Sequence, residues 1–488
     1  MVLLSTVARV LFAGVTELGI DEVYYTTYAR YPDWSHFDHP PFVGWLIQLT
    51  TFDIGLDHEI FIRLSSILLA IVNSILIWQI VKQLGGAKSA GIALLLYNGS
   101  IYASVISGIF IMPDTAMLTC LLLAYRSLLA LVLNEGNNIR NWVGFGVFMG
   151  LSMLSKLHAG FLWLGFLLFI LAYRPNWLLR WKLYLSGLIS CLFLIPIIYW
   201  NVENEFASFT FHGNRIAGGG GGIQFSYFLQ ELLGSVAYNN PINFFLIWIT
   251  LIALFRKKKI SNYTIDGLYF YTGLPLILIF LGISLFKQTL PHWSAPAYTL
   301  MIIPASVYLR TRMRSVFAWA SASYGVVCLL MVLGAFVINN IHFGPREVVD
   351  EKLGRSDFTL DMSCWKQMGE LFAEVHKEAM KKKLTDSSTP IVINRWFPGA
   401  HIDWYIGRPN RLDVVSVGDI DRLHKYHWIA EEEGLEFEPG KVHYYLTTSH
   451  LFGDVEKIAA FRTSTLLSKV PVYKDGDVVE FLFVYLVQ

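Results

Sequence analysis

The chain contains few charged residues for its length. Only 15% of its 488 residues are charged, whereas 54% are hydrophobic; soluble domains usually contain about 25% charged residues. The net charge is +1, and no basic stripe with interleaved aromatic residues is present, so nothing indicates nucleic-acid binding. With a mean hydropathy of +0.48, this composition is typical of a protein that crosses a lipid bilayer many times.

Cysteine is also scarce. Three of the four cysteines lie in apolar runs, and Cys364 lies alone near the C-terminus. No CxxC or other metal-binding spacing occurs, which argues against a disulfide framework. No cleavable signal peptide is recognisable. The apolar residues 1–15 are short for a span of about 20 residues, so we expect a tilted first helix or a start that is internal.

Long apolar runs dominate the first two thirds of the sequence and predict about eleven transmembrane helices. Their approximate limits are 1–16, 60–82, 89–110, 115–133, 142–155, 158–173, 183–200, 235–255, 265–286, 293–309 and 315–338. With a cytoplasmic N-terminus, every basic cluster falls in an inner loop, as the positive-inside rule requires. Residues 1–339 are therefore expected to form a membrane module with large outer loops at 17–59 and 201–234.

Residues 340–488 differ from the rest because charges return and apolar runs shorten. They predict an extracytoplasmic α/β domain. Its expected elements are helices over 361–382 and 454–462, strands over 390–395, 413–417 and 442–447, and a hairpin over 470–487 that turns at 475–477. The glycine run 218–222 is interpreted as a flexible hinge, because a phosphate cradle would need a preceding strand.

Polar residues that are unusual for a membrane protein converge on the outer side of this topology. Ionisable groups at a membrane are costly unless they have a function. The groups are Asp21 and Glu22; His36, Asp38 and His39; Asp114; Lys156 and His158; His212, Asn214 and Arg215; and Lys287 and His292.

Each of these residues has a structural alternative. The acids Asp21, Glu22 and Asp114 suit helix capping. A loop hydrogen bond suits His39, and interfacial snorkelling suits Lys156. Headgroup binding suits Arg215 and Lys287, and an interfacial aromatic pair suits His292 with Trp293. Their convergence nevertheless favours a site in which a carboxylate takes a proton from an attacking hydroxyl and cations stabilise a departing phosphate.

The order of the motifs resembles the GT-C superfamily of polyprenyl-phosphate-sugar glycosyltransferases over residues 1–310. The branch it is most similar to contains the bacterial lipid A aminoarabinose transferases and is related to the protein O-mannosyltransferases. The motifs are Asp21-Glu22-x-x-Tyr25, Phe37-Asp38-x-Pro40-Pro41, Pro113-Asp114, Ser155-Lys156, Asn201-x-x-x-x-Phe206-x-Ser208-Phe209 and Pro291-His292-Trp293. The segment from Trp365 to Tyr405 resembles the C-terminal domain of uncharacterised bacterial members.

The resemblance implies a GT-C fold in the bacterial inner membrane, with the C-terminal domain in the periplasm. It implies that Asp21 is the base, Glu22 the second acid of the pair and Asp114 an organiser of the site. Where aminoarabinose transferases carry a lysine before Pro-Pro, this chain has His39, which is shorter and only partly charged near neutral pH. Substrate and phosphate binding are expected from His39, Lys156, Arg215, Lys287, His292, Tyr24 and Tyr25.

The reaction that this resemblance implies is inverting transfer of a sugar from a polyprenyl-phosphate donor to a hydroxyl of a lipid, glycan or protein acceptor. No cofactor is required, although a divalent metal is compatible with Asp21, Glu22 and His39. Two alternatives remain: a lipid or glycan transporter, which predicts internal repeats and midplane charges, and a non-catalytic membrane subunit that binds a glycan.

Overall fold

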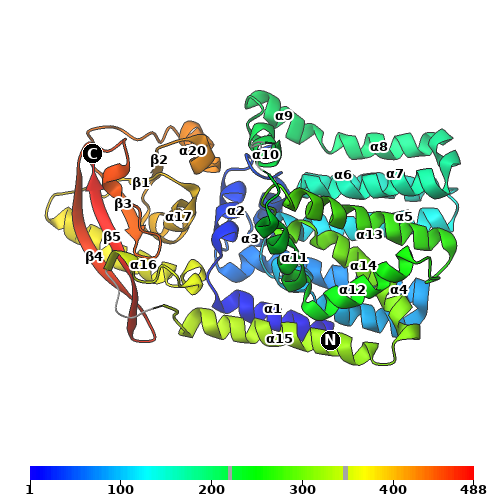
Figure 1. Ribbon diagram of the computed structural model, residues 1–488. Coiled ribbons are helices and arrows are strands. Elements are labelled where there is room, and N and C mark those ends of the chain that lie inside the picture. Colours follow the sequence, from blue (N-terminus) through cyan, green and yellow to red (C-terminus); the bar gives the residue numbers. More distant parts are fainter. Residues whose placement is uncertain (218–221, 345–349) are drawn as a thin grey trace. The chain divides into compact units, whose positions relative to one another are not determined.

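The computed structural model describes residues 1–217, 222–344 and 350–488, which form two compact units (Figure 1). The helical unit contains residues 1–11, 33–56 and 60–331. The C-terminal unit contains residues 12–32, 57–59 and 332–488. Each unit is described by itself.

Apolar helices form the helical unit. They are α1 (Val2–Val15), α3 (Phe42–Thr51), α4 (Glu59–Asn98), α5 (Pro113–Leu133), α6 (Ile139–Ser155), α7 (Phe161–Tyr173), α8 (Trp181–Leu192), α9 (Ile195–Glu203), α10 (Ala207–Ala217), α11 (Phe225–Asn239), α12 (Pro241–Phe255), α13 (Tyr263–Ser284), α14 (Ala295–Arg312) and α15 (Val316–Asn340). Among the described residues, four helices are long and apolar enough to cross a membrane, or up to seven if each bent pair is one span. The count of eleven therefore stays a prediction.

Two helix boundaries differ from the expected limits for local reasons. Helix α4 is interrupted at Gly86, within the expected gap between the spans 60–82 and 89–110; the φ of Gly86 is 77°, a left-handed conformation that favours glycine. The helix ends at Asn98 rather than at residue 110, and the π-helical turn Tyr102–Ile106 follows. The expected span 235–255 is instead two helices, α11 and α12, bent by 106°. Asn240 has a φ of 69° at this bend, and Pro241 supplies no backbone donor to continue the first helix.

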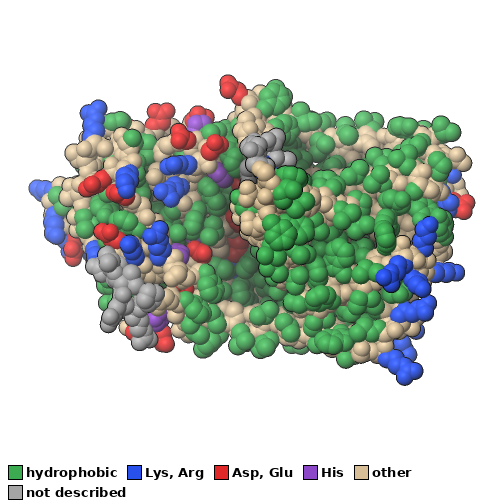
Figure 2. All heavy atoms as spheres, in the orientation of Figure 1, with side chains coloured by type: hydrophobic (Ala, Val, Ile, Leu, Met, Phe, Trp, Pro, Cys, Tyr) green, Lys and Arg blue, Asp and Glu red, His purple; other side chains and the backbone are tan. Residues whose placement is uncertain are grey.

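The basic clusters gather at one end of the helical unit (Figure 2). The Arg310 guanidinium donates to the Gly85 carbonyl at 2.9 Å, and that of Arg180 donates to the Glu135 carbonyl at 2.6 Å. Loops that are far apart in the sequence therefore meet at this end, as the charge pattern predicted. The side of the membrane that this end faces stays a prediction.

A five-stranded sheet, in the order β2-β1-β3-β5-β4, organises the C-terminal unit. The parallel strands β1 (Ile391–Ile393), β2 (Val414–Ser416) and β3 (His443–Thr448) confirm the expected strands, and β4 (Ser464–Lys474) pairs with β5 (Asp477–Val487) as the expected hairpin. Asp475 and Gly476 form its turn with φ of 51° and 86°, as a two-residue turn with left-handed residues requires. The expected helix 454–462 is wrong, because only the 3₁₀ turn Val455–Lys457 forms there.

Helices cover this sheet, and their sequence patterns explain their packing. Helix α16 (Trp365–Lys381) is the expected amphipathic helix, and it buries Trp365, Met368, Phe372 and Ala379 at the three- and four-residue spacing of a helix face. The shorter helices are α17 (Trp396–His401), α18 (Arg408–Asn410), α19 (Ile420–Leu423) and α20 (Lys425–Glu433).

An N-terminal helix is built into the same unit. Helix α2 (Ile20–Arg30) ends at Arg30, whose guanidinium forms an ion pair with Asp403 at 2.7 Å. The Tyr426 hydroxyl donates to the same carboxylate at 2.9 Å, and the Tyr24 ring packs against Trp396 with centroids 5.0 Å apart. Residues 17–59 are therefore more than a loop, because a part of them belongs to the folded core of the C-terminal unit.

Buried Glu480 in β5 should make the stability of the protein depend on pH. It is 1% exposed, and its Oε1 has no hydrogen-bond partner among the described residues; burial raises its pKa to about 8. Because this folded-state pKa exceeds that of an unfolded glutamate, about 4.3, the stabilising contribution is full below about pH 4 and is lost as the pH rises to about 8. We expect the thermal midpoint of the purified protein to fall between about pH 6 and about pH 8.

Glu480→Gln should flatten this pH dependence, since the amide cannot ionise. The exposed Glu456 provides the matched control, and Glu456→Gln should leave the profile unchanged. An unaltered profile in Glu480→Gln would contradict the assignment.

Candidate functional site

A cavity of ≈ 400 Å³ lies in the helical unit and has two chemically different parts. One part is an apolar wall made by Phe161, Ile197, Phe209, Phe280, Ile283 and Trp293. The other is a polar end made by Ser35, Asp38, His39, Lys156, His158 and His212. Small-molecule sites commonly combine a mostly apolar lining with a few placed polar groups, so this cavity is the candidate site of the unit.

Asp114 and Lys156 form a buried ion pair at the polar end. The Lys156 Nζ lies 2.6 Å from the Asp114 Oδ2, and the Tyr102 hydroxyl donates to the Asp114 Oδ1 at 2.9 Å. Asp114 is 0% exposed and Lys156 is 5% exposed. Asp114 lies in the first turn of α5, but Met112 is the N-cap residue, so the N-cap alternative for Asp114 is wrong. The snorkelling alternative for Lys156 is also wrong, because its ammonium group points inward to a carboxylate.

Local sequence explains how these two side chains meet. Pro113 begins α5, and proline favours the first position of a helix because its missing N–H is not needed there. Lys156 follows the last residue of α6 and has extended backbone with φ of −156°, which ends that helix. The Ser155 hydroxyl donates to the Pro113 carbonyl at 2.6 Å, so the end of α6 is fastened to the start of α5.

Three imidazoles, those of His39, His158 and His292, lie near this ion pair, and His212 lies beside His39. The His212 Nε2 lies 3.0 Å from the Asp38 carbonyl, and the ring centroids of His39 and His212 are 6.5 Å apart. Burial lowers the pKa of His39 to about 3 and that of His292 to about 4. Both rings are therefore neutral near pH 7, and the buried ammonium group of Lys156 supplies a positive charge at the polar end. The buried His158 Nε2 has no hydrogen-bond partner among the described residues, so it is available to a ligand.

The turn at residues 289–294 supplies His292 and Trp293, and α11 holds this turn in place. The Thr289 hydroxyl donates to the Glu231 Oε2 at 2.7 Å, and the Ser294 hydroxyl donates to the Oε1 at 3.0 Å. Gly234, one helical turn further along, lies against Pro291, so close that an added Cβ would lie 2.1 Å from the proline ring. A glycine and a buried glutamate on one helix face thus position the turn.

Asp114 and His292 do not themselves line this cavity, although Asp114 is paired with Lys156, which does. The remaining expected site residues are not part of it either. Lys287 is half-buried beyond the end of α13 and does not line it. The Arg215 side chain lies outside the part of the chain that the structure describes, as do residues 218–221 of the expected glycine hinge. The headgroup-binding alternative for Lys287 and Arg215 therefore stays open.

Asp21, Glu22, Tyr24 and Tyr25 lie on α2, in the C-terminal unit. Asp21 is exposed, whereas Glu22 is buried and its Oε2 accepts a hydrogen bond from the Gly19 N–H at 2.9 Å, as the capping alternative predicted. Tyr24 and Tyr25 are 1% and 3% exposed, so their evident contribution is packing. The pairing of Asp21 with Asp114 in one site stays a prediction.

The described residues contain no group of three or more His, Cys, Asp or Glu side chains that could hold a metal ion. Glu22 already accepts the capping hydrogen bond described above. A metal bound by Asp21, Glu22 and His39 stays a prediction.

Two residues that shape the cavity gave no signal in the sequence. Tyr102 follows an apolar helix without a recognisable motif, and Glu231 is a single acid within an amphipathic stretch. The role of Tyr102 depends on its contact with Asp114. The role of Glu231 depends on its contact with the 289–294 turn, which is distant in sequence. His158 and His212 were recognised only as members of the polar layer.

The chain is similar to a known protein family and to solved structures. Residues 38–200 match the family model described as dolichyl-phosphate-mannose-protein mannosyltransferase; this range includes His39, Asp114 and Lys156 but not Asp21. No curated protein matches the sequence significantly. The crystal structure of ArnT from Cupriavidus metallidurans in the apo state has a TM-score of 0.63 at 16% identity, covering 98% of this chain and 96% of that chain.

The same ArnT bound to undecaprenyl phosphate has a TM-score of 0.60 at 16% identity, covering 99% of this chain and 97% of that chain. The likeness therefore extends over both units of the chain and over nearly the whole of the other protein. This chain has the fold of ArnT, and its residues 38–200 resemble the dolichyl-phosphate-mannose-protein mannosyltransferase family.

Proposed function

We propose that this protein is an integral membrane glycosyltransferase. It moves a sugar from a polyprenyl-phosphate donor to a hydroxyl of a cell-envelope acceptor, at the outer face of a bacterial cell membrane. The observation that carries this proposal is the cavity, in which an apolar wall adjoins a polar end with the buried cation Lys156. An isoprenoid chain suits the wall, and its phosphate suits Lys156 and the unpaired His158 nitrogen.

The ion pair between Lys156 and Asp114 would position a positive charge beside the leaving phosphate in such a site. A lysine beside a departing phosphate stabilises the negative charge that develops in the transition state. The Asp114 carboxylate and the Tyr102 hydroxyl fix the position of Lys156, so that little reorganisation is needed during the reaction. His39 and His292 are neutral and contribute hydrogen bonds rather than charge.

Asp21 is the proposed base. Its carboxylate takes the proton of the acceptor hydroxyl, the acceptor oxygen forms a bond to the anomeric carbon, and the bond from that carbon to the phosphate oxygen breaks. The configuration inverts, and polyprenyl phosphate leaves without needing a general acid. Asp21 suits this role because it is exposed at the start of α2, where an acceptor can reach it.

Reconstitution of the purified protein in nanodiscs tests the proposal. We expect a panel of polyprenyl-phosphate sugars to include a donor from which the protein releases polyprenyl phosphate and glycosylates an envelope extract, as measured by mass spectrometry. Lys182→Met is the matched control. It removes a lysine from the loops that carry the basic clusters, where Lys182 donates to the Asn137 carbonyl, and it should retain transfer. Movement of intact lipid-linked sugar across liposomes without any transfer would instead identify a transporter.

A further inference from the structure

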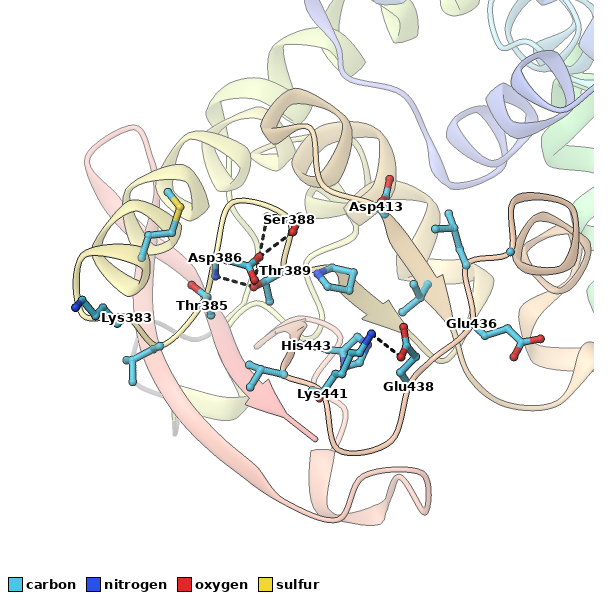
Figure 3. Close-up of a pocket in the computed structure, with 17 residues that line it drawn as sticks. Lys383, Thr385, Asp386, Ser388, Thr389, Asp413, Glu436, Glu438, Lys441 and His443 are labelled. Atoms are coloured by element: carbon cyan, nitrogen blue, oxygen red, sulfur yellow. Dashed lines mark hydrogen bonds and ion pairs between the residues drawn. The ribbon is translucent and has the colours of Figure 1, made fainter.

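A second cavity lies entirely within the C-terminal unit and shares no residue with the one that contains Lys156. This cleft of ≈ 740 Å³ is formed where β1, β2 and β3 begin, with Pro390, Asp413 and Val442 in its lining (Figure 3). The segment 383–389 after α16 forms one side, and the segment 434–441 forms the other. Its volume lies within the range of about 300–1,000 Å³ that is usual for small-molecule sites.

His443, the first residue of β3, places an unused acceptor in this cleft. It is 2% exposed, and its Nδ1 lies 3.0 Å from the Lys441 carbonyl. Burial lowers the pKa of His443, so the ring is neutral, and its Nδ1 carries the proton that it donates to this carbonyl. The Nε2 is then an acceptor, and no described residue hydrogen-bonds to it. Because His443 lines the cleft, a ligand in the cleft can donate a hydrogen bond to this acceptor.

Asp386 provides a second acceptor, and its position is fixed. Its Oδ1 accepts from the Ser388 N–H at 2.9 Å, from the Ser388 hydroxyl at 2.9 Å and from the Thr389 hydroxyl at 3.1 Å. These bonds leave the Oδ2 for a ligand. In Figure 3, Asp386 and Thr389 lie across the cleft from His443 and Lys441.

The charges of the lining restrict the kind of ligand. The lining contains four carboxylates, Asp386, Asp413, Glu436 and Glu438, and two lysines, Lys383 and Lys441. Lys441 is neutralised by Glu438 at 2.6 Å, which leaves three acids and one lysine. The cleft therefore disfavours phosphate and other anions, and it favours a ligand that is rich in hydrogen-bond donors and is neutral or cationic.

We propose that this cleft binds a sugar residue of a glycan, prefers an amino sugar over a neutral one and rejects a phosphorylated one. The Asp386 Oδ2 and the His443 Nε2 accept hydrogen bonds from its hydroxyl or ammonium groups. The choice of a sugar among donor-rich ligands rests on the proposed function. The charge preference does not, because it follows from the lining alone.

Calorimetric titration of the full chain in nanodiscs of neutral lipid tests this proposal with three probes: the trimer of glucosamine, its N-acetylated form and glucosamine 6-phosphate. We expect the glucosamine trimer to bind with a Kd below about 1 mM, the acetylated trimer more weakly, and the phosphorylated sugar not at all. Binding of the cationic trimer should weaken with added salt, since the charges are exposed. Sugar transfer is not measured, so this test and that of the proposed function fail independently.

Two variants with opposite expected effects keep the test decisive. Asp386→Asn should weaken binding of the glucosamine trimer about fivefold, the upper range for an exposed charge pair. Lys383→Gln removes the unpaired lysine and should strengthen binding about twofold, a gain that misfolding does not produce. Glu456→Gln, outside the cleft in the same unit, is the control. Equal affinity for all probes, or the same Kd in Asp386→Asn and Lys383→Gln, would overturn the proposal.

Discussion

Asp21→Asn should lower sugar transfer about 10²–10⁴-fold, the usual contribution of a general base, and leave the fold intact. Asn has nearly the same size as Asp but accepts no proton at neutral pH. Asp21 is exposed in the first turn of α2. The substitution loses the favourable interaction of an acid with the helix N-terminus, worth about 0.3–1 kcal/mol. The measurement is the rate of polyprenyl phosphate release in nanodiscs, with the thermal midpoint as a check of folding.

The exposed Asp53 provides the matched control for this substitution, because it lies in the same sequence segment between residues 17 and 59. Asp53→Asn should leave transfer unchanged. If Asp21→Asn retains full activity, Asp21 is not the base, although the cavity with Lys156 would still be a candidate donor site. A loss of activity together with a lower thermal midpoint would point to a structural role of Asp21 instead.

Lys156→Met should be the most destabilising single substitution of the site and should abolish donor use. It leaves the Asp114 carboxylate, which is 0% exposed, without its cation. Removing one partner of a buried ion pair typically costs about 3–5 kcal/mol. The same change removes the fixed charge that faces the leaving phosphate. We expect a lower thermal midpoint and no detectable release of polyprenyl phosphate.

The double variant Lys156→Met with Asp114→Leu separates these two effects. Replacing both members of a buried pair by apolar residues is often neutral for stability or even stabilising, so the thermal midpoint should recover. Transfer should remain absent, because no cation is left at the polar end of the cavity. A double variant that regains transfer would show that Lys156 serves stability alone.

Composition and periodicity predicted much of this fold from the sequence. The apolar runs gave the helices, the basic clusters gave one end of the helical unit, and the short β-branched runs gave β1, β2 and β3. The break at Gly86 lies in the predicted gap between the spans 60–82 and 89–110. The break at Asn240 was missed because a single left-handed residue hardly changes the hydropathy of a long run. The expected helix 454–462 was wrong, since a short segment with few buried residues has little tertiary packing to stabilise a helix.

The site could be predicted only in part for the same kind of reason. The predicted topology placed Asp114, Lys156 and His39 in one layer, but it did not indicate which of these side chains contact one another. The 2.6 Å contact between Lys156 and Asp114 depends on how the end of α6 meets the start of α5. The neutrality of His39 depends on burial, to which its sequence neighbours gave no guide. This histidine is therefore neutral near pH 7, and in the proposed function Lys156 supplies the charge at the phosphate.

The ion pair between Arg30 and Asp403 has a consequence for biosynthesis. The two residues are separated by 373 positions, and a ribosome that adds about 5–20 residues per second needs on the order of 20–75 s to cover this distance. During that time α2 is synthesised but lacks the partners that bury it. A nascent or truncated chain thus carries Asp21 on an unanchored segment. The helix that carries the proposed base acquires its C-terminal contacts only when translation nears its end. The proposed sugar transfer therefore requires synthesis of the whole chain.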